Sequence, residues 1–319
     1  MDVTPHLSPQ NRIGFLLIDG FALLSYAAAM EPLRAANLQT GGPFYDIRHF
    51  CAHGEVARSS SGAVIEADNI DNGQTDLDLL LVIAGGDPVA FQNLSVFRWL
   101  RELAARGVRL GGVSGGPVIL ALAGVVEGRR LTVHWEHAEA LAEISPSLLL
   151  ERSLYVIDRD RVSCAGGTAA LDMMHALLTE NHGSAFTRKI SDWFMHTEVR
   201  PSGGPQRAGL EERYGSRNPV VISAIEAMEN HIADPLALPQ LAGLAGVGSR
   251  QINRLFQSRM GISTMSFYSD LRLEKARSLV MQSPLSITDI ALATGFASSA
   301  HFSAAFRKKY NLTPSSLRV

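Results

Sequence analysis

The sequence predicts a protein of two domains, an N-terminal α/β domain with a parallel sheet and a C-terminal all-α domain with two helix-turn-helix motifs. Three observations predict it. Between residues 12 and 195, apolar runs alternate with helical patterns, which is typical of a parallel sheet covered on both faces. Between residues 238 and 317, one short pattern occurs twice. The charge also divides, because residues 1–199 hold 15 Lys and Arg against 23 Asp and Glu, whereas residues 218–319 hold ten against six.

The 319 residues are enough for two domains. We place the α/β domain at residues 1–199, a linker at 200–219 and the helical domain at 220–319. The linker RPSGGPQRAGLEERYGSRNP is rich in Gly, Pro and charged residues and has no periodicity. We therefore expect relative motion of the two domains to be absorbed in this linker.

The elements of the N-terminal domain follow from their apolar patterns. Buried parallel strands are predicted where apolar residues run almost unbroken, at 12–18, 77–83 and 108–113. Shorter strands are expected at 45–51, 56–65, 154–157 and 162–164, and a hairpin at 59–62 interrupts the second of these. Helical spacing predicts helices over 23–38, 96–106, 117–124 and 168–180.

The C-terminal repeat carries the strongest pattern in the chain. Its first copy reads LPQLAGLAGVGSRQINRLFQSRMGIS and its second ITDIALATGFASSAHFSAAFRKKYNLT. An apolar i, i+3 face, a Gly at the break and a second segment ending in Phe and basic residues are the pattern of a helix-turn-helix. Four positions recur at an offset of 49, pairing Leu238, Leu241, Ala242 and Gly246 with Ile287, Ile290, Ala291 and Gly295. A helix over 220–232 is expected before the first copy, and a long helix over 266–282 joins the two.

The second helix of each motif presents polar residues that suit the major groove of double-stranded DNA. Arg suits guanine, and Asn or Gln suits adenine. The expected base-reading residues are Arg250, Gln251, Asn253 and Arg254 in the first copy, and Ser298, Ser299, His301 and Ser303 in the second. Basic residues at the far end of the second copy, Arg307, Lys308 and Lys309, are expected to contact phosphates.

The connecting helix supports the same interpretation. It spans roughly 25 Å at about 1.5 Å per residue, which suits two recognition helices in successive major grooves. The alternative is that these polar residues only form the solvated face of a helical bundle. A single motif would leave that alternative open, but two copies at one spacing favour a reader of DNA.

The composition limits the other function classes. Apolar residues make up 46% of the chain and charged residues 19%, as in soluble globular proteins, and no apolar run reaches the roughly 18 residues of a membrane span. The N-terminus lacks a signal-peptide pattern, and two cysteines, Cys51 and Cys164, exclude a disulfide framework, so we expect a cytoplasmic protein. No Cys/His set has zinc-ligand spacing, and we expect neither a metal nor a cofactor. Both cysteines are expected to be buried and inert, with redox sensing as the alternative.

Both halves of the chain resemble known families. Residues 220–319 resemble the AraC/XylS-type DNA-binding domain, through IxxIAxxxGF at 287–296, HFSxxF at 301–306 and the closing Pro314. Residues 12–195 resemble the class I glutamine amidotransferase-like fold of the PfpI group, a flavodoxin-like parallel-sheet fold. The motifs that carry this resemblance are IAGG at 83–86, GGVSGGPVILALAG at 111–124, TVHW at 132–135 and CAGGTAALDMM at 164–174. In this order the two domains resemble the GlxA-like branch of AraC-type regulators, which implies a transcriptional regulator.

The resemblance also identifies the position where an enzyme of the PfpI group would carry its nucleophile. Such enzymes place a Cys at a sharp strand-to-helix turn, with a Glu from the first helix nearby. Here Ser114 stands at that turn, Gly115 follows it, and Glu31 matches the Glu by position. A serine hydroxyl needs a base, and His134 lies 20 residues on, so we expect no catalytic residue and no enzyme. The alternative is an amidase, deglycase or hydratase fused to a DNA-binding module.

A turn of this kind can still bind a ligand. The N–H groups of Gly115 and Gly116 at a helix start would suit a carboxylate. Trp135 and Tyr26 would offer aromatic faces to a cation, unless both only pack in a core. The expected effector site comprises Tyr26, Glu31, Ser114, Gly115, Gly116, His134 and Trp135.

The family resemblance implies the class of effector and the partners. The segment SDWFMHTEVRPSGGPQRAG at 191–209 looks most like regulators of quaternary-amine catabolism (carnitine, glycine betaine), with arginine-responsive regulators as the neighbouring possibility. A homodimer that activates transcription with RNA polymerase is implied. A nucleoid-associated DNA protein without an effector is the third alternative, which a second domain of this size disfavours.

Overall fold

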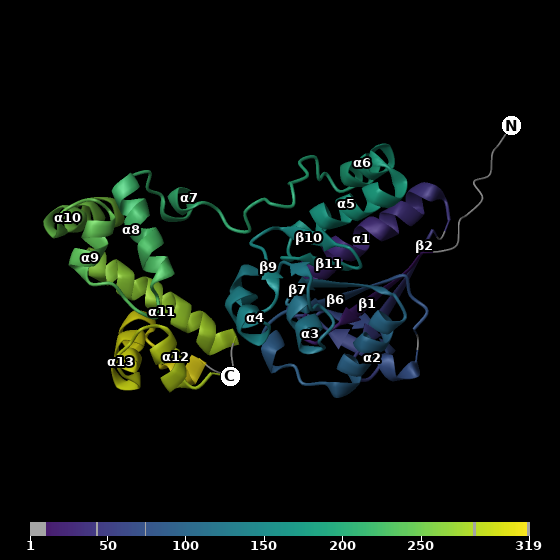
Figure 1. Cartoon of the computed structure of the whole chain (residues 1–319), viewed down its shortest axis with the longest axis horizontal. Helices are drawn as coiled ribbons and strands as arrows, with labels where there is room; N and C mark the ends of the chain where they lie inside the picture. The colour runs from purple at the N-terminus through teal and green to yellow at the C-terminus, as the bar shows by residue number, and fades with distance from the viewer. Residues whose placement is uncertain (1–10, 43, 74, 283–284, 318–319) are drawn as a thin grey trace. The chain divides into compact units, whose positions relative to one another are not determined.

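The computed structural model describes residues 11–42, 44–73, 75–282 and 285–317. The chain divides into two compact units, Met1–Gln206 and Arg207–Val319. Figure 1 shows strands in the first unit and helices throughout the second.

A seven-stranded sheet forms the centre of the first unit. Its order is β10 (Tyr155–Asp158), β11 (Arg161–Cys164), β7 (Arg109–Ser114), β6 (Leu79–Ala84), β1 (Asn11–Leu17), β2 (Tyr45–Cys51) and β5 (Asp68–Asn69). All neighbours pair in parallel except β10 and β11. This antiparallel edge arises because a tight turn reverses the chain at Arg159, which has φ of 58°.

Helices cover both faces of the sheet (Figure 1). One face packs against α1 (Leu23–Thr40), α5 (Ala169–His182) and α6 (Ser184–Trp193), and the other against α2 (Leu94–Ala105) and α3 (Gly116–Leu122). Leu17, Leu33 and Met173 lie in the first core, and Leu80 and Leu100 lie in the second, each at most 2% exposed. Two layers of apolar side chains therefore hold the carboxyl ends of β1, β6 and β7 in fixed positions.

Several smaller elements complete the first unit. Two short pairs, β3 (Val56–Arg58) with β4 (Val64–Glu66) and β8 (Arg130–Leu131) with β9 (Leu149–Leu150), lie outside the main sheet. The first pair confirms the hairpin expected near residues 59–62. Neither α6 nor α4 (Ala138–Ile144) was predicted from the sequence, because α4 is short and α6 directly follows α5 at Gly183.

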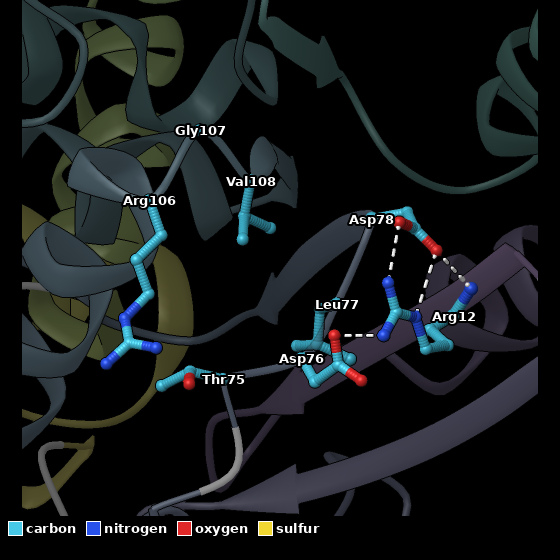
Figure 2. A pocket seen from close by; sticks show the side chains of 8 residues that line it. All are labelled: Arg12, Thr75, Asp76, Leu77, Asp78, Arg106, Gly107 and Val108. Carbon is cyan, nitrogen blue, oxygen red and sulfur yellow. Dashed lines mark hydrogen bonds and ion pairs between the residues drawn. The ribbon is translucent and has the colours of Figure 1, made fainter.

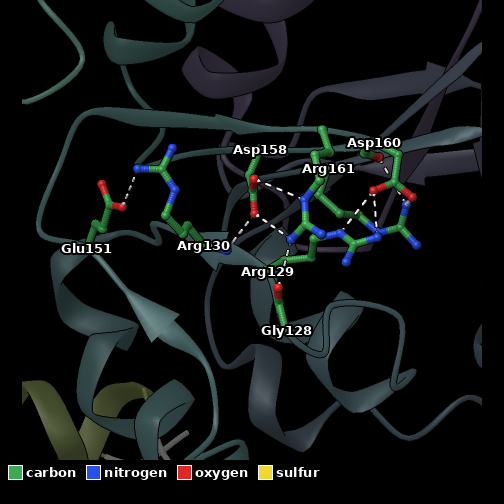
Figure 3. A network of polar contacts seen from close by, with 8 residues as sticks. Gly128, Arg129, Arg130, Glu151, Asp158, Asp160 and Arg161 are labelled. Carbon is green, nitrogen blue, oxygen red and sulfur yellow. Dashed lines mark hydrogen bonds and ion pairs between the residues drawn. The ribbon is translucent and has the colours of Figure 1, made fainter.

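Ion pairs hold the β10–β11 hairpin to the chain around β8 (Figure 3). Asp160 pairs with Arg161 at 2.8 Å and with Arg129 at 2.9 Å. Arg130 donates its backbone N–H to Asp158, and its side chain pairs with Glu151 at 3.1 Å. The side chain of Arg161 is 7% exposed and also donates to a backbone carbonyl oxygen, so it is the least solvated arginine of this network.

The second unit consists of helices. They are α7 (Leu210–Tyr214), α8 (Pro219–Asn230), α9 (Leu238–Leu244), α10 (Ser249–Met260), α11 (Thr264–Gln282), α12 (Ile287–Ala293), α13 (Ser299–Tyr310) and α14 (Pro314–Leu317). The pairs α9–α10 and α12–α13 are the two predicted helix-turn-helix motifs. The short α7 falls inside the predicted linker, where five residues were too few to show a helical period.

Each helix-turn-helix motif has its own core, and α11 contributes to both. Phe256 of α10 packs with Phe267 and Leu271 from the first half of α11. Phe302 and Phe306 of α13 pack with residues from its second half, Leu273, Ala276 and Val280. The sequence repeat therefore corresponds to two small cores joined by one helix.

Among the described residues, no helix is long and apolar enough to cross a membrane. The same part of the chain has no group of three or more His, Cys, Asp or Glu side chains that could hold a metal ion. Cys51 and Cys164 are both buried, and burial raises the pKa of the Cys164 thiol to about 12.

Candidate ligand site and nucleic-acid interface

The first candidate site is the sharp turn between β7 and α3, here called the elbow. Strand β7 ends at Ser114, and α3 begins two residues later at Gly116. Ser114 has φ of 61°, a left-handed conformation that residues other than Gly rarely adopt. A Cβ atom on Gly116 would lie 2.0 Å from the carbonyl oxygen of Val82, so the turn requires Gly at this position. Strain of about 1–3 kcal/mol at such a residue is found preferentially at functional sites.

Three other segments enclose Ser114, whose exposed fraction is 7%. A Cβ atom on Gly166, just after β11, would lie 2.7 Å from Ser114 Cβ and 2.8 Å from Ser25 Oγ. Ser25 Oγ accepts a hydrogen bond of 2.7 Å from the N–H of Gly167. The carbonyl oxygen of Ser114 accepts one of 3.3 Å from the N–H of His134. The start of α1, the loop before α5 and the segment at His134 therefore meet at the elbow.

Helix α1 brings Ser25 to the elbow and gives Glu31 a different partner. Glu31 lies about 1.7 turns after Ser25 at about 3.6 residues per turn, and its Oε2 is 2.6 Å from Arg34 Nη2 on the same helix. Glu31 therefore has an ion-pair partner on its own helix, and Ser25 is the α1 residue whose side chain bonds to the loop at the elbow. The sequence offered no signal for Ser25 beyond its place at the start of that helix.

The backbone at Gly115 corrects one expectation. Its N–H donates a hydrogen bond of 3.0 Å to the carbonyl oxygen of Ala84, so it is not available to a carboxylate ligand. Helix α3 has seven residues, which makes its start a poor anion site by itself. The expected pair of N–H donors at Gly115 and Gly116 is therefore not formed.

Tyr26 also differs from its expected role. Its side chain is 4% exposed and lies edge-on to Phe15 and Phe21. Its hydroxyl lies 2.8 Å from His49 Nε2, and burial, with a smaller contribution from Glu31, raises its pKa to about 12. Tyr26 is thus a core residue, which was the alternative weighed for it.

Trp135 and His134 lie at the surface beside the elbow. Trp135 is 41% exposed, and its ring lies 5.3 Å from that of His134, centroid to centroid. His134 Nδ1 lies 3.6 Å from a carboxylate oxygen of Glu136. Burial lowers the pKa of His134, and burial together with His134 lowers the pKa of His137 to about 4, so both rings are neutral at pH 7.

A hollow of about 480 Å³ lies at the opposite edge of the sheet, where β1, β6 and β7 begin (Figure 2). Its wall includes Arg12, whose guanidinium pairs with both Asp76 and Asp78. The charge of Arg12 is therefore already balanced within the protein, and this hollow does not involve the elbow.

Helix α10 of the first helix-turn-helix separates its buried and exposed faces clearly. Ile252 and Phe256 are fully buried, whereas Arg250, Gln251 and Arg254 are exposed. These three side chains are exposed on the second helix of the motif, and we propose that they contact bases.

Asn253 behaves differently from its neighbours on α10. It is half-buried, and its Oδ1 accepts a hydrogen bond of 3.1 Å from the N–H of Thr264 at the start of α11. This contact links α10 to the first turn of α11 and occupies the Oδ1 acceptor of Asn253.

Helix α13 of the second motif presents fewer exposed side chains that could contact bases. His301 is exposed, and its ring rests edge-on against Phe296 at 5.7 Å. Ser298 caps the helix by accepting from the N–H of His301, while Ser299 and Ser303 are half-buried. His301 is therefore the residue of α13 that we propose for direct base contacts.

At the basic end of α13, two residues are exposed and one forms ion pairs within the protein. Arg307 and Lys308 are exposed, as phosphate contacts require. Lys309 instead pairs with Asp270 and Glu274 of α11, at 3.4 and 3.2 Å. This corrects the expectation for Lys309, which ties the two helices together.

Replacing Arg254 by Ala is expected to weaken specific DNA binding by about 1–3 kcal/mol, because a base contact would be lost from an exposed side chain. Affinity would be measured on a duplex selected from random sequence by the wild-type protein. Arg259→Ala, in the last turn of the same helix, is the control and should change affinity much less. Equal effects of the two substitutions would show that Arg254 makes no base contact.

Comparison with known proteins agrees with this geometry. A helix-turn-helix domain model matches residues 241–319, and a DJ-1/PfpI family model matches residues 11–180. The HTH-type transcriptional regulator GlxA of Rhizobium meliloti is 44% identical over 97% of this chain and 95% of its own length. This chain belongs to the GlxA-type transcriptional regulators. It is a DNA-binding regulator whose AraC-type helical domain follows a PfpI-like domain.

Other relatives of this GlxA-type regulator share the whole architecture. The regulators CdhR and GbdR of Pseudomonas aeruginosa are 37% and 36% identical, over 96% and 97% of this chain and 90% and 86% of theirs. The crystal structure of an AraC family transcriptional regulator from Pseudomonas putida is 28% identical and covers 58% of this chain and all of its own, with a TM-score of 0.54. These relatives are named as regulators, although the DJ-1/PfpI fold also includes enzymes.

Proposed function

We propose that this GlxA-type regulator binds a quaternary amine beside the elbow of its α/β unit, and that binding changes its affinity for promoter DNA. The observation that carries the proposal is the surface at His134, Trp135 and Glu136. An exposed indole beside a carboxylate suits a permanent cation. Because both neighbouring histidines are neutral at pH 7, they do not repel that cation. The resemblance of residues 191–209 to regulators of quaternary-amine catabolism supports the same class.

We also propose that the α/β unit has no catalytic role. Within the described residues, no hydrogen bond joins Ser114 Oγ to a base, and His134 Nδ1 lies 3.6 Å from a carboxylate oxygen of Glu136. Without a base, a serine hydroxyl at pH 7 is a poor nucleophile. The alternative, an amidase or hydratase fused to a DNA-binding module, predicts turnover of an amide or aldehyde substrate that disappears in Ser114→Ala.

The test is titration calorimetry of the full-length protein with glycine betaine, carnitine and choline. The neutral isostere 3,3-dimethylbutan-1-ol has the shape of choline without its charge and should bind more weakly. Trp135→Ala should weaken binding by about 0.5–2 kcal/mol, because the cation loses an aromatic face. Trp193→Ala is the matched control, since that indole is also exposed. Equal binding of the neutral isostere, or equal effects of the two tryptophan substitutions, would contradict the proposed site.

The regulatory half of the proposal is tested by DNA affinity. A ligand shifts an equilibrium only if it binds one state better than the other, so glycine betaine at saturation must change the affinity of the full chain for its selected duplex. We further propose that the protein acts as a homodimer and activates transcription with RNA polymerase. A run-off assay with purified polymerase, with and without glycine betaine, should show more transcript when the ligand is present.

A further inference from the structure

Residues 196–206, here called the strap, lie at the end of the first unit. Side chains bind the strap to this unit at two anchors, and between them the carbonyl oxygen of Ser202 accepts a hydrogen bond of 2.7 Å from the N–H of Leu154. The first anchor is Asp172 of α5, whose side chain is fully buried. Its Oδ1 accepts from His196 Nε2 and from the N–H of Arg200, each at 2.9 Å. Its Oδ2 accepts from Arg200 Nη2 at 2.6 Å. Arg200 Nη2 also donates to Thr168 Oγ1 at 2.9 Å.

The second anchor is Gln206. Its Nε2 lies within hydrogen-bond distance of three acceptors, Thr132 Oγ1 at 3.0 Å and the carbonyl oxygens of Val133 at 3.1 Å and Ser153 at 2.7 Å. Its Oε1 is buried and has no partner among the described residues. A buried acceptor without a partner costs about 1–3 kcal/mol, so this anchor is the weaker of the two.

Each anchor includes one contact to a residue that is next in sequence to a residue at the elbow. Thr168 directly follows Gly166 and Gly167, which contact Ser114 and Ser25. Val133 directly precedes His134, whose N–H donates to the Ser114 carbonyl oxygen. A change in the backbone at the elbow therefore reaches each anchor through a single short loop.

Beyond Gln206 the chain soon belongs to the second unit. Leu210 packs on the core of the first helix-turn-helix, and both Arg213 and Tyr214 bond to Glu229 of α8. Three residues, 207–209, thus join the strap to α7. The length of chain that connects the two units therefore depends on whether the strap is bound to the first unit.

We propose that the strap is a tether controlled by the elbow: a ligand bound beside Ser114 changes the hold of Gln206 and Arg200, and so lengthens or shortens the connection to the DNA-binding unit. This rests on the proposed function, because it needs a ligand at the elbow. In this scheme the segment predicted as a linker, residues 200–219, contains the end of the strap and the helix α7. Asp172 and Gln206 are positioning residues in this scheme.

The first experiment needs no ligand. Amide hydrogen exchange of the full chain would be compared between wild type and Gly166→Ala, whose new Cβ would press on Ser114 and Ser25. Gly183→Ala is the matched control, because Gly183 also has positive φ but lies in open space at the other end of α5. Peptides covering residues 196–206 should exchange at least about tenfold faster in Gly166→Ala than in Gly183→Ala. Exchange in β1 and β6 reports whether the whole unit has been destabilised.

Ser25→Ala provides a milder second variant, because it removes only the acceptor of the Gly167 N–H. It should raise strap exchange in the same direction without a new side chain at the elbow. Unchanged strap exchange in both Gly166→Ala and Ser25→Ala, with the sheet still protected, would overturn the proposal. Equal acceleration of strap and sheet in Gly166→Ala would also count against it if Ser25→Ala left the strap unchanged.

The second experiment separates the tether from the proposed function. Gln206→Ala should retain binding of glycine betaine by calorimetry but lose at least half of the ligand-dependent change in DNA affinity. Retained binding with an unchanged DNA response would overturn the tether alone. No binding of glycine betaine to wild type would contradict the proposed function, while the exchange result would still decide whether elbow and strap are coupled.

Discussion

Replacing Phe302 by Ala is expected to destabilise the second helix-turn-helix by about 3–5 kcal/mol and to abolish specific DNA binding. Its side chain is fully buried and contacts the rings of Phe296 and Phe306, at centroid distances of 5.3 and 5.5 Å. Truncation leaves a cavity that a core of this size cannot fill. Because the two motifs have separate cores, α12 and α13 should lose protection while α9 and α10 keep most of theirs.

Amide hydrogen exchange measures this difference directly, since a chain of two units need not unfold in one transition. Leu292→Ala is the matched control, because it removes a similar apolar group from a side chain that is 59% exposed, and it should change stability by less than about 0.5 kcal/mol. Equal loss of protection in both helix-turn-helix motifs would show that they share one cooperative core.

The second large effect is expected at the Asp172–Arg200 ion pair. Arg200→Ala leaves a carboxylate with no exposed surface and without its guanidinium partner, which should cost about 3–5 kcal/mol. Asp172→Ala should cost less, because the side chain of Arg200 is 39% exposed and can turn to water. The double substitution should be more stable than Arg200→Ala alone, since no buried charge remains.

Tryptophan fluorescence during urea unfolding suits this measurement, because all three tryptophans of the chain lie within residues 1–206. Arg109→Ala is the control: its ion pair with Glu180, also on α5, is 3.5 Å long and exposed, so its loss should cost at most about 1 kcal/mol. If Asp172→Ala destabilised the unit more than Arg200→Ala, the cost of leaving the buried carboxylate of Asp172 unpaired would not be the dominant effect.

The sequence predicted the DNA-binding unit in detail because its information is periodic. The i, i+3 apolar positions, the Gly at each break and the offset between copies all report local helical geometry, and the buried Phe256 and Phe306 confirm it. The pattern could not show which polar residues already bond to another part of the protein. Asn253 and Lys309 look like their exposed neighbours in sequence, and only the contact of each with α11 distinguishes them.

The elbow was predicted less completely. Its place at the end of a buried strand followed from the pattern around Ser114, because Gly residues and a Pro mark the start of a helix. The approach of Ser25 and Gly166 depends on how α1 and α5 pack on the sheet, which no local pattern encodes. The strap was missed for a related reason, since Arg200 and Gln206 bond to residues about 30 to 75 positions earlier in the chain.

The shared helix α11 has a consequence for the DNA that this regulator can read. Its 19 residues form one rigid rod of roughly 28 Å, and both recognition helices are packed on it. Because α10 and α13 are both packed on α11, they cannot adjust their separation when the spacing of the contacted bases changes. One base pair inserted between the two contacted segments would rotate the second by about a tenth of a helical turn. If both helices contact bases as we propose, we expect the spacing between the two contacted segments to be as much a part of the operator as base identity.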